Sequence, residues 1–580
     1  MPKVEVLSVA IGALFLFAFL GFSGVSADNT QYLLGALERS NPDFLVNDWF
    51  VQTTQSFHPL FEIYMAWWLE LDQLVAGLFI WYAINLLWLS AALLALIKYL
   101  GLTERLPLAM ILAVGLLLVG VRHGWGMYEI LTGQALPAYL AYPPALLTIV
   151  FLFRRRFLFS AAAVVVTFLI HHGLGALLIL CMLGPIIVTM PRTRQELIQV
   201  GLGLAMVLAV FLPVILGTVD KDSSRASDFA ILFYGRSPQH YAIQFSDLRT
   251  QLSGLHIFAA SVILAFTIRQ KDLRLKVQSL VVSIGVLCLL GYLLLEFWYT
   301  PVFVRLFPYR AIPILVVLNC CMIASLLLTS SLTRRELGTI SLVAFSSICF
   351  RYSLPVSFIL LALAMVLPWV RPMNSPAATG EARAAFSVIC SVGVLSLLLM
   401  TSQNRPAFFP DWPSPMRRVL VNVFDEHTSK NAVIVVPPWL SGIRIDAERA
   451  IVVNTKSFPV YGPEMVEWAD RMHDISGVDP RFAKQYLQMG ENIWQLYNEG
   501  YHARSLRDLV AAAHKYKARF ILVSTNSRFH WEAGQNDLRS LWSGNGYALY
   551  KTPGGVVQHV IDKTSRAISY RGDERMRSTV

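Results

Sequence analysis

Apolar runs long enough to cross a membrane recur from the N-terminus to residue 402, separated by short polar stretches. A helix needs about 20 apolar residues to span the hydrocarbon core of a bilayer. By this criterion the hydrophobic pattern predicts about thirteen transmembrane helices. Their expected ranges are 5–25, 72–99, 105–122, 135–153, 157–170, 173–190, 197–217, 252–269, 277–297, 309–330, 337–350, 355–370 and 385–402.

The hydrophobic pattern changes near Thr401, where a Pro-rich linker at 403–415 leads into a more polar segment at 416–565. NAVIVVPPWL, RAIVVNTKSFP and ARFILVSTN read as strands, and apolar residues at helical spacing fill the stretches between them. GYALYKTPGGVVQHVI predicts a closing hairpin. Strands alternating with helices indicate a small α/β domain with a mostly parallel sheet. No Gly-rich phosphate loop follows a strand, and residues 566–580 are expected to be a frayed tail.

The composition places the chain among polytopic membrane proteins. Hydrophobic residues make up 55% of its 580 residues and charged residues 15%, whereas soluble domains carry about 25% charged residues. Much of the net charge of +11 lies in short loops between apolar runs, so it predicts orientation in a membrane and not nucleic-acid binding. All six cysteines lie within apolar runs, which favours buried thiols over a disulfide framework or a zinc site.

Basic residues and loop lengths together predict the topology. Short basic loops face the cytoplasm, and the longer mixed loops at 26–71, 122–134, 218–251 and 298–308 face the opposite side. An odd number of crossings then places the N-terminus in the cytoplasm and the domain at 416–565 outside. The first apolar run is expected to stay uncleaved, because no small-residue cleavage site follows it. The expected location is a bacterial inner membrane, with a periplasmic C-terminal domain. Residues 1–402 form the expected transmembrane domain.

Two predicted hairpins are unusually short. FLFSAAAVVVTFLI ends at His171 and His172 before the chain turns back, and GTISLVAFSSICFRYSLP turns at Arg351. Their arms of about 14 to 18 residues fall below the usual spanning length of about 20. Helices that end within the membrane need protein or a water-filled cavity to satisfy their backbone ends. The tips therefore indicate either thin hairpins packed in the bundle or the floor of a cavity that opens outward.

Acidic residues gather in the first outer loop. Asp28 follows the first apolar run directly, and Asp43 and Asp48 lie farther along the same loop with His58. A carboxylate at a helix end is common, because charge is tolerated there. An acid beside a partly desolvated cavity gains basicity, which suits a residue that takes a proton from a hydroxyl group.

The odd helix count, the inner N-terminus, the acidic first outer loop and the outer α/β domain together resemble the GT-C superfamily of membrane glycosyltransferases. This resemblance implies a polyprenyl-phosphate-linked sugar as donor, with Asp28 as candidate base and Asp48 as a second acid for acceptor positioning or metal binding. The sequence departs from the superfamily at Ala27-Asp28-Asn29, where an adjacent acid pair is common, and it has no WWD-type signature. These departures argue against protein N-glycosylation and against an obligatory metal, which leaves Mg²⁺ or Mn²⁺ as an optional cofactor. ERAIVVNTKSFP and VEWADRM also resemble uncharacterised bacterial proteins with GT-C-like bodies.

Phosphate binding is expected to fall to cationic side chains. Arg305 and Arg310 are favoured, because guanidinium groups match phosphate oxygens, although outer arginines also bind ordinary lipid headgroups. Arg351 at a hairpin tip is a candidate because ionisable residues at membrane depth are commonly functional. The further substrate-binding candidates are His58, Arg122, His123, His171 and His172. Arg449, Lys456, Trp468 and Arg471 in the tail are interpreted as residues that hold the α/β fold together.

Two other functions remain open. A polysaccharide polymerase or O-antigen-ligase-like enzyme would share the lipid-linked donor but rely more on arginine and histidine than on a first-loop aspartate. A transporter or lipid-handling protein without catalysis would usually show two repeated halves. The two short hairpins, at 157–190 and 337–370, are consistent with this function, although the two halves of the sequence share no evident similarity. The expected partners are a lipid-linked sugar, membrane lipids and an unknown acceptor.

Overall fold

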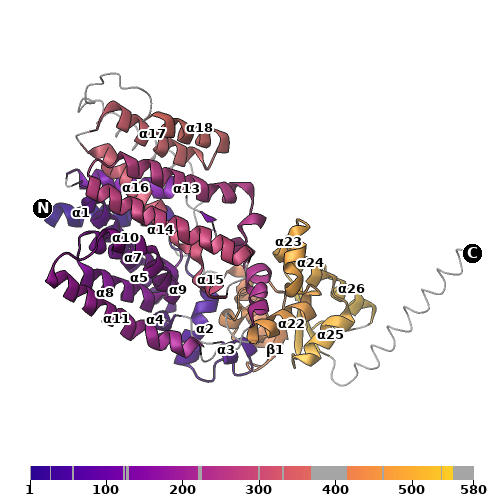
Figure 1. Cartoon of the computed structure of the whole chain (residues 1–580). Coiled ribbons are helices and arrows are strands. Elements are labelled where there is room, and N and C mark those ends of the chain that lie inside the picture. Colours follow the sequence, from indigo (N-terminus) through magenta and orange to yellow (C-terminus); the bar gives the residue numbers. More distant parts are fainter. Residues whose placement is uncertain are drawn as a thin grey trace, which may run out of the picture. The chain divides into compact units, whose positions relative to one another are not determined.

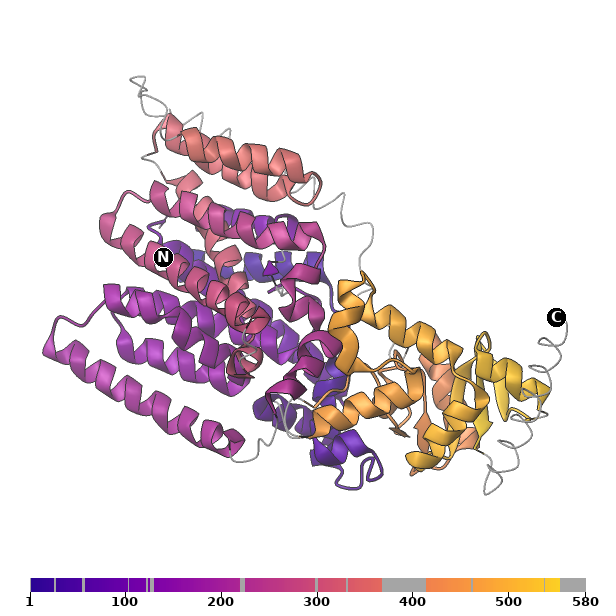
Figure 2. The ribbon, with the colours of Figure 1, turned by 45° about the vertical axis from the view of Figure 1, so that its right-hand side comes forward.

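The computed structural model describes residues 2–25, 28–54, 58–102, 104–121, 124–125, 130–219, 225–297, 301–329, 332–367, 414–459, 463–536 and 538–552. Contacts group the chain into two units, which Figures 1 and 2 show in sequence colours. The helical unit comprises Met1–Ser26, His58–Asp222 and Ser237–Pro410. The mixed unit comprises Ala27–Phe57, Ser223–Arg236 and Asp411–Val580. Parts of two expected outer loops therefore group with the C-terminal segment.

Most helices of the helical unit are apolar and lie close to the predicted ranges, whereas the short ones at 59–70, 238–241 and 301–306 fall in the predicted outer loops 26–71, 218–251 and 298–308. The helices of this unit are α1 (Pro2–Leu20), α4 (Pro59–Glu70), α5 (Leu74–Tyr99), α6 (Leu106–Val119), α7 (Pro137–Phe153), α8 (Phe157–Ile170), α9 (His172–Cys181), α10 (Leu183–Val188), α11 (Arg194–Val219), α12 (Pro238–Tyr241), α13 (Leu248–Thr267), α14 (Lys271–Glu296), α15 (Pro301–Leu306), α16 (Ile312–Leu328), α17 (Arg334–Cys349) and α18 (Leu354–Val366). The expected helix at 385–402 and the expected frayed tail lie outside the described residues.

Six helices in the described part are long and apolar enough to cross a membrane, so the protein is a helical multi-pass membrane protein. Their burial separates the centre of the bundle from its surface. In the most apolar 18 residues of Phe303–Leu328, the stretch that ends with α16, 94% are buried, compared with 11% in those of α11. A helix that is apolar all round and also buried belongs to the core. α16 accordingly packs against α5, α6, α13 and α17, and α11 packs against α8.

Both short hairpins predicted from the sequence are present as paired helices. α8 packs against α9, and α17 packs against α18, as Figure 2 shows for the second pair. The expected helix at 173–190 is interrupted at Met182. The interruption follows from Pro185, which has no N–H and whose ring would crowd the carbonyl of Cys181, four residues earlier.

The mixed unit contains a five-stranded sheet in the order β2-β1-β3-β5-β4. Its strands are β1 (Val433–Val435), β2 (Ala450–Ile451), β3 (Phe520–Ser524), β4 (Trp542–Gly544) and β5 (Tyr547–Lys551). The β2-β1-β3 part is parallel, and β3-β5-β4 is antiparallel. The expected mostly parallel sheet was therefore only half right. The second half of the hairpin predicted at 546–561 lies outside the described residues. The β4–β5 hairpin turns earlier, at Asn545 and Gly546, which both have positive φ as a two-residue Asn-Gly turn requires.

The helices of the mixed unit include two short ones from the first predicted loop. They are α2 (Asn29–Ser40), α3 (Trp49–Thr53), α20 (Pro415–His427), α21 (Ile443–Asp446), α22 (Glu464–Ser476), α23 (Ala483–Gln488), α24 (Ile493–Ala503), α25 (Leu506–Lys515) and α26 (Arg528–Gln535), together with the π-helix η3 (Ile231–Arg236). One of the stretches with apolar residues at helical spacing, FAKQYLQMGENIWQLYNEGY at 482–501, forms two helices and not one. Gly490 has a φ of +81° between them, and Asn492 caps the second.

Candidate functional site

In the helical unit, the α8–α9 tip joins a histidine to an arginine. His171 is the N-cap of α9, where its Nδ1 accepts a hydrogen bond from the backbone N–H of Leu174 at 3.1 Å. Its Nε2 lies 3.1 Å from Nη1 of Arg310, which belongs to the short turn η5 (Pro308–Ala311) before α16. The hydroxyl of Tyr142 donates to the backbone carbonyl of Arg310 at 3.2 Å. The structure thus brings together two residues that the sequence analysis chose separately.

The hydrogen bonds of His171 are in conflict. A neutral imidazole has one N–H and one lone pair, and a guanidinium group only donates. Leu174 and Arg310 both present an N–H to the ring, so either tautomer leaves one donor facing another donor. An oxyanion beside His171 and Arg310 would accept a hydrogen bond from each, with the imidazole proton on Nε2. Both groups are therefore able to donate to an anion when the imidazole proton is on Nε2.

His58 adds a second imidazole to this cluster. It is the N-cap of α4, and its ring centroid lies 4.7 Å from that of His171. Burial lowers the pKa of His58 to about 3, and the charges of His172 and Arg310 act in the same direction. His58 is therefore neutral at physiological pH. Its backbone N–H donates to Oε1 of Glu62, which is itself buried, at 3.3 Å.

The remaining predicted cations lie in different surroundings. Arg305 is on α15, which packs against α9 and α14. The ring of the candidate His172 lies against that of Phe168, with centroids 4.8 Å apart. Arg351 is exposed at the α17–α18 turn, and its backbone carbonyl accepts a hydrogen bond from Arg249 at 2.7 Å. Arg122 and His123 lie outside the described residues.

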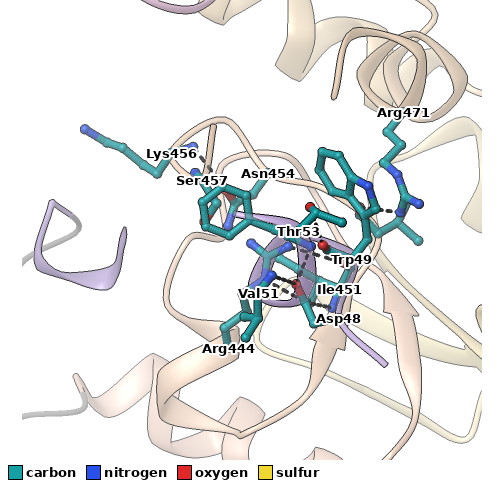
Figure 3. A network of polar contacts seen from close by, with 12 residues as sticks. Asp48, Trp49, Val51, Thr53, Arg444, Ile451, Asn454, Lys456, Ser457 and Arg471 are labelled. Carbon is teal, nitrogen blue, oxygen red and sulfur yellow. Dashed lines mark hydrogen bonds and ion pairs between the residues drawn. The ribbon is translucent and has the colours of Figure 1, made fainter. Parts of the chain in front are cut away.

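In the mixed unit, Asp48 is fully buried and both of its carboxylate oxygens are engaged (Figure 3). Oδ1 accepts from the backbone N–H of Phe50 at 3.0 Å and of Val51 at 3.1 Å, which caps α3. Oδ2 accepts from the backbone N–H of Ile451 at 2.9 Å and from Nε of Arg444 at 2.7 Å. These contacts describe a residue that fixes the loop, and they leave Asp48 no exposed oxygen.

Asp28 is in a contrasting position. Its Oδ1 accepts a hydrogen bond from Nζ of Lys456 at 2.6 Å, and 44% of its side chain is exposed. Lys456 follows β2 and lies in a turn held by Asn454, whose Oδ1 accepts from the backbone N–H of Lys456 and of Ser457. Of the two candidate acids, only Asp28 therefore presents a carboxylate that a substrate can reach.

Next to this network, Arg471 is held between two aromatic rings. Its guanidinium lies 4.6 Å from the ring centroid of Trp49 and 4.3 Å from that of Tyr516. Its Nε donates to Oε1 of Glu467 at 2.7 Å. The interpretation of Arg471 as a residue that holds the fold agrees with these contacts. Figure 3 shows Trp49 and Arg471 beside each other.

The sequence analysis missed the partners of both acids. Arg444 was not singled out, and Lys456 was given only a structural role. The one local signal was Asn454, because an Asn side chain often hydrogen-bonds the backbone two residues further along and so builds a turn. Among the described residues no group of three or more histidine, cysteine, aspartate or glutamate side chains is arranged to hold a metal ion.

Comparisons with known proteins give one family match and several structural likenesses. A domain of unknown function, DUF6798, matches residues 418–475, the segment that carries Arg444, Asn454, Lys456 and Arg471. None of the curated proteins matches the chain. The solved structures that resemble it include two GT-C superfamily membrane glycosyltransferases.

The first is ArnT from Cupriavidus metallidurans bound to undecaprenyl phosphate, at 12% identity over 95% of this chain and 98% of that one, with a TM-score of 0.46. The second is the archaeal oligosaccharyltransferase AglB from Archaeoglobus fulgidus, in complex with an inhibitory peptide and a dolichol-phosphate. It is 10% identical over 90% of this chain and 69% of that one, with a TM-score of 0.47. Such values describe a distant likeness in chain path, and the roles of residues must come from this chain itself.

Proposed function

We propose that the protein is a GT-C-type membrane glycosyltransferase of the bacterial inner membrane. It would move a sugar from a polyprenyl-phosphate-linked donor to an acceptor on the outer face. The observation that carries this proposal is the pairing of His171 with Arg310 at the α8–α9 tip, where two groups that can donate to an oxyanion lie 3.1 Å apart. A lipid-linked phosphate is an anion, so it matches such a site in charge.

The reaction needs two kinds of help. The bond between the anomeric carbon and the phosphate oxygen breaks while the acceptor oxygen bonds to that carbon, which inverts the configuration. The acceptor gives up its proton to a base, and the lipid phosphate leaves with its negative charge. We assign the base role to Asp28, the candidate acid with an exposed carboxylate. Arg310 and His171 stabilise the departing phosphate, where preorganised donors have their largest effect.

The other candidates receive supporting roles. Asp48 holds the loop that carries Asp28, through the contacts of its two oxygens. His58 keeps an uncharged imidazole next to His171, so the cluster offers donors without a second permanent cation. Arg305, on a helix packed against α9, is assigned as a further cation that binds the phosphate.

The test is mass spectrometry of polyprenyl-phosphate lipids and surface glycans in cells that carry the wild type, a deletion, Asp28→Asn, or His171→Asn, at matched protein levels. Asparagine at position 171 retains an oxygen for the helix cap but removes the Nε2 donor, so it tests anion binding and not the fold. Asp43→Asn, an exposed acid in the same loop, is the matched control.

The transferase predicts that one lipid-linked sugar accumulates in the deletion and in both test variants, while Asp43→Asn resembles the wild type. Accumulation in the deletion and in His171→Asn but not in Asp28→Asn would move the base elsewhere and favour the polymerase or ligase. If neither lipids nor glycans change in the deletion, glycosyl transfer is wrong and transport becomes the function to test.

A further inference from the structure

Lys456 is held by its backbone from two directions. The buried side chain of Asn454 accepts hydrogen bonds from the backbone N–H of Lys456 at 3.1 Å and of Ser457 at 2.7 Å. Nη2 of Arg236, at the end of the π-helix η3, donates to the backbone carbonyl of Lys456 at 3.2 Å. A local turn and one distant segment therefore hold the backbone of this residue, and Figure 3 shows Asn454 beside Lys456 and Ser457.

The ammonium group of Lys456 is directed at the one exposed candidate acid, since Nζ lies 2.6 Å from Oδ1 of Asp28. With exposed side-chain fractions of 36% for Lys456 and 44% for Asp28, such a pair contributes little to stability, because solvent screens the two charges. Holding a lysine side chain in one geometry also costs rotamer entropy, which offsets that small gain. Stability therefore does not explain why a fixed backbone points a lysine at this carboxylate.

A second ion pair joins the same two segments and already anchors them. Asp48 and Arg444 are 0% and 1% exposed, and Asp48 also binds the backbone of Ile451, five residues before Lys456. The buried Asp48–Arg444 pair thus already fixes the loop, so the accessible Asp28–Lys456 pair is not required for that purpose. We therefore interpret the Asp48–Arg444 pair as structural and the Asp28–Lys456 pair as available to a substrate.

We propose that Lys456 is a positioning residue for Asp28, supplied to the reaction by the segment 418–475 whose domain family has no known function. Lys456 holds Oδ1 of the carboxylate, so that Oδ2, to which no described residue hydrogen-bonds, is directed toward the hydroxyl of the acceptor. The inference rests on the proposed function, because it gives Lys456 no role other than through Asp28. It assigns to the C-terminal domain a part in the chemistry and not only in folding.

The test measures turnover by full-length protein in membranes from the deletion strain, with the lipid-linked sugar that those membranes accumulate as substrate. The variants are Lys456→Met, Lys456→Arg, Asp28→Asn and the double variant Asp28→Asn/Lys456→Met. Lys430→Met is the matched control, because Lys430 lies in the same segment on the surface, paired with Glu448 at 3.6 Å.

We expect Lys456→Met to lower kcat by roughly ten- to a hundredfold, since small misplacements of a reacting group have effects of that order. KM for the donor should change little, Lys456→Arg should recover part of the rate, and Lys430→Met should match the wild type. The double variant should be no slower than Asp28→Asn alone, because a residue that acts through Asp28 has nothing left to position.

Three results would overturn the role of Lys456. If the losses in kcat of the two single variants multiply in the double variant, Lys456 acts independently of Asp28. If Lys456→Met raises KM for the donor at unchanged kcat, Lys456 binds the donor directly. If Lys456→Met speeds hydrogen exchange at Ile451 as Asp48→Ala does, its role is merely structural. If Asp28→Asn itself keeps the wild-type rate, or the deletion accumulates no lipid, the proposed function has failed, and the role of Lys456 fails with it.

Discussion

Replacing Asp48 by alanine is expected to release the first predicted loop, which carries α3, from the C-terminal segment that carries Arg444 and Ile451. The change removes the carboxylate that accepts from the backbone N–H of Phe50, Val51 and Ile451, and it leaves Arg444 as a buried charge without its partner. Breaking one side of a buried ion pair costs about 3–5 kcal/mol. The five-residue helix α3 has no stability of its own to offset this loss, because isolated helices of this length do not form in water.

Hydrogen exchange measures the effect directly in the full-length, detergent-solubilised protein. At tenfold per 1.4 kcal/mol, the expected loss accelerates exchange at Phe50, Val51 and Ile451 by roughly a hundredfold to a few thousandfold. The exposed Asp43→Ala in the same loop is the control and should leave these rates unchanged.

A second variant separates the effect of leaving Arg444 unpaired from the effect of losing the other hydrogen bonds of Asp48. Asp48→Ala combined with Arg444→Met removes the orphaned charge and should recover part of the protection, which gives a coupling free energy between the two residues. The reasoning is refuted if Asp48→Ala exchanges at the wild-type rate, or if the double variant is as unprotected as the sum of both single variants.

Three further variants test other parts of the structure. Because the folded pKa of His58, about 3, lies below its ordinary 6.5, its contribution to stability is present above pH 6.5 and is lost as the pH falls toward 3. The wild type should therefore lose about 2 kcal/mol between pH 7 and pH 5, and His58→Asn should show a flatter melting temperature across that range. Tyr497→Phe removes the hydrogen bond from the phenol to the carbonyl of Gly235 at 2.9 Å, and an orphaned buried acceptor should cost about 1–3 kcal/mol, visible as faster proteolysis near residue 236. Gly254→Ala would place a Cβ 2.3 Å from the indole of Trp125, so overpacking should lower the melting temperature by the equivalent of about 1–3 kcal/mol, with a shift in tryptophan emission.

The apolar helices could be predicted closely because hydropathy is a local property of the chain. The range 157–170 is the observed α8, and most other predicted helices in the described part differ by a few residues at their ends, whereas α4, α12 and α15 fall in predicted outer loops. The errors came from backbone geometry that depends on single residues. Pro185 interrupts one expected helix, Gly490 another, and the Asn545-Gly546 turn makes half of the sheet antiparallel. Each signal was present in the sequence but weaker than the hydrophobic pattern around it.

The candidate site was predictable in its residue types and not in its pairings. Arg310 was chosen because guanidinium groups match phosphate oxygens, and His171 and His58 were chosen as further substrate-binding candidates; the three lie together in the helical unit. Asp48 was chosen as an acid of the first outer loop, yet its partner Arg444 is 396 positions away. No periodicity or local motif links positions so far apart, so only the folded chain could show that the carboxylate is buried.

The architecture of the sheet explains why the first loop folds with the tail. β2 is an edge strand, paired on one side with β1, so its other side presents backbone groups that would otherwise be a template for aggregation. The N–H of Ile451 in β2 donates to Asp48, and the carbonyl of Ile451 accepts from Arg444. The loop therefore closes the edge of the sheet with a side chain instead of a strand. A carboxylate suits this position better than a neutral side chain, because it accepts from the strand N–H and from the guanidinium with one oxygen while the other caps α3. The same contacts join the segments that carry Lys456 and Asp28, so losing Asp48 should disturb the Lys456–Asp28 pair as well as the edge of the sheet.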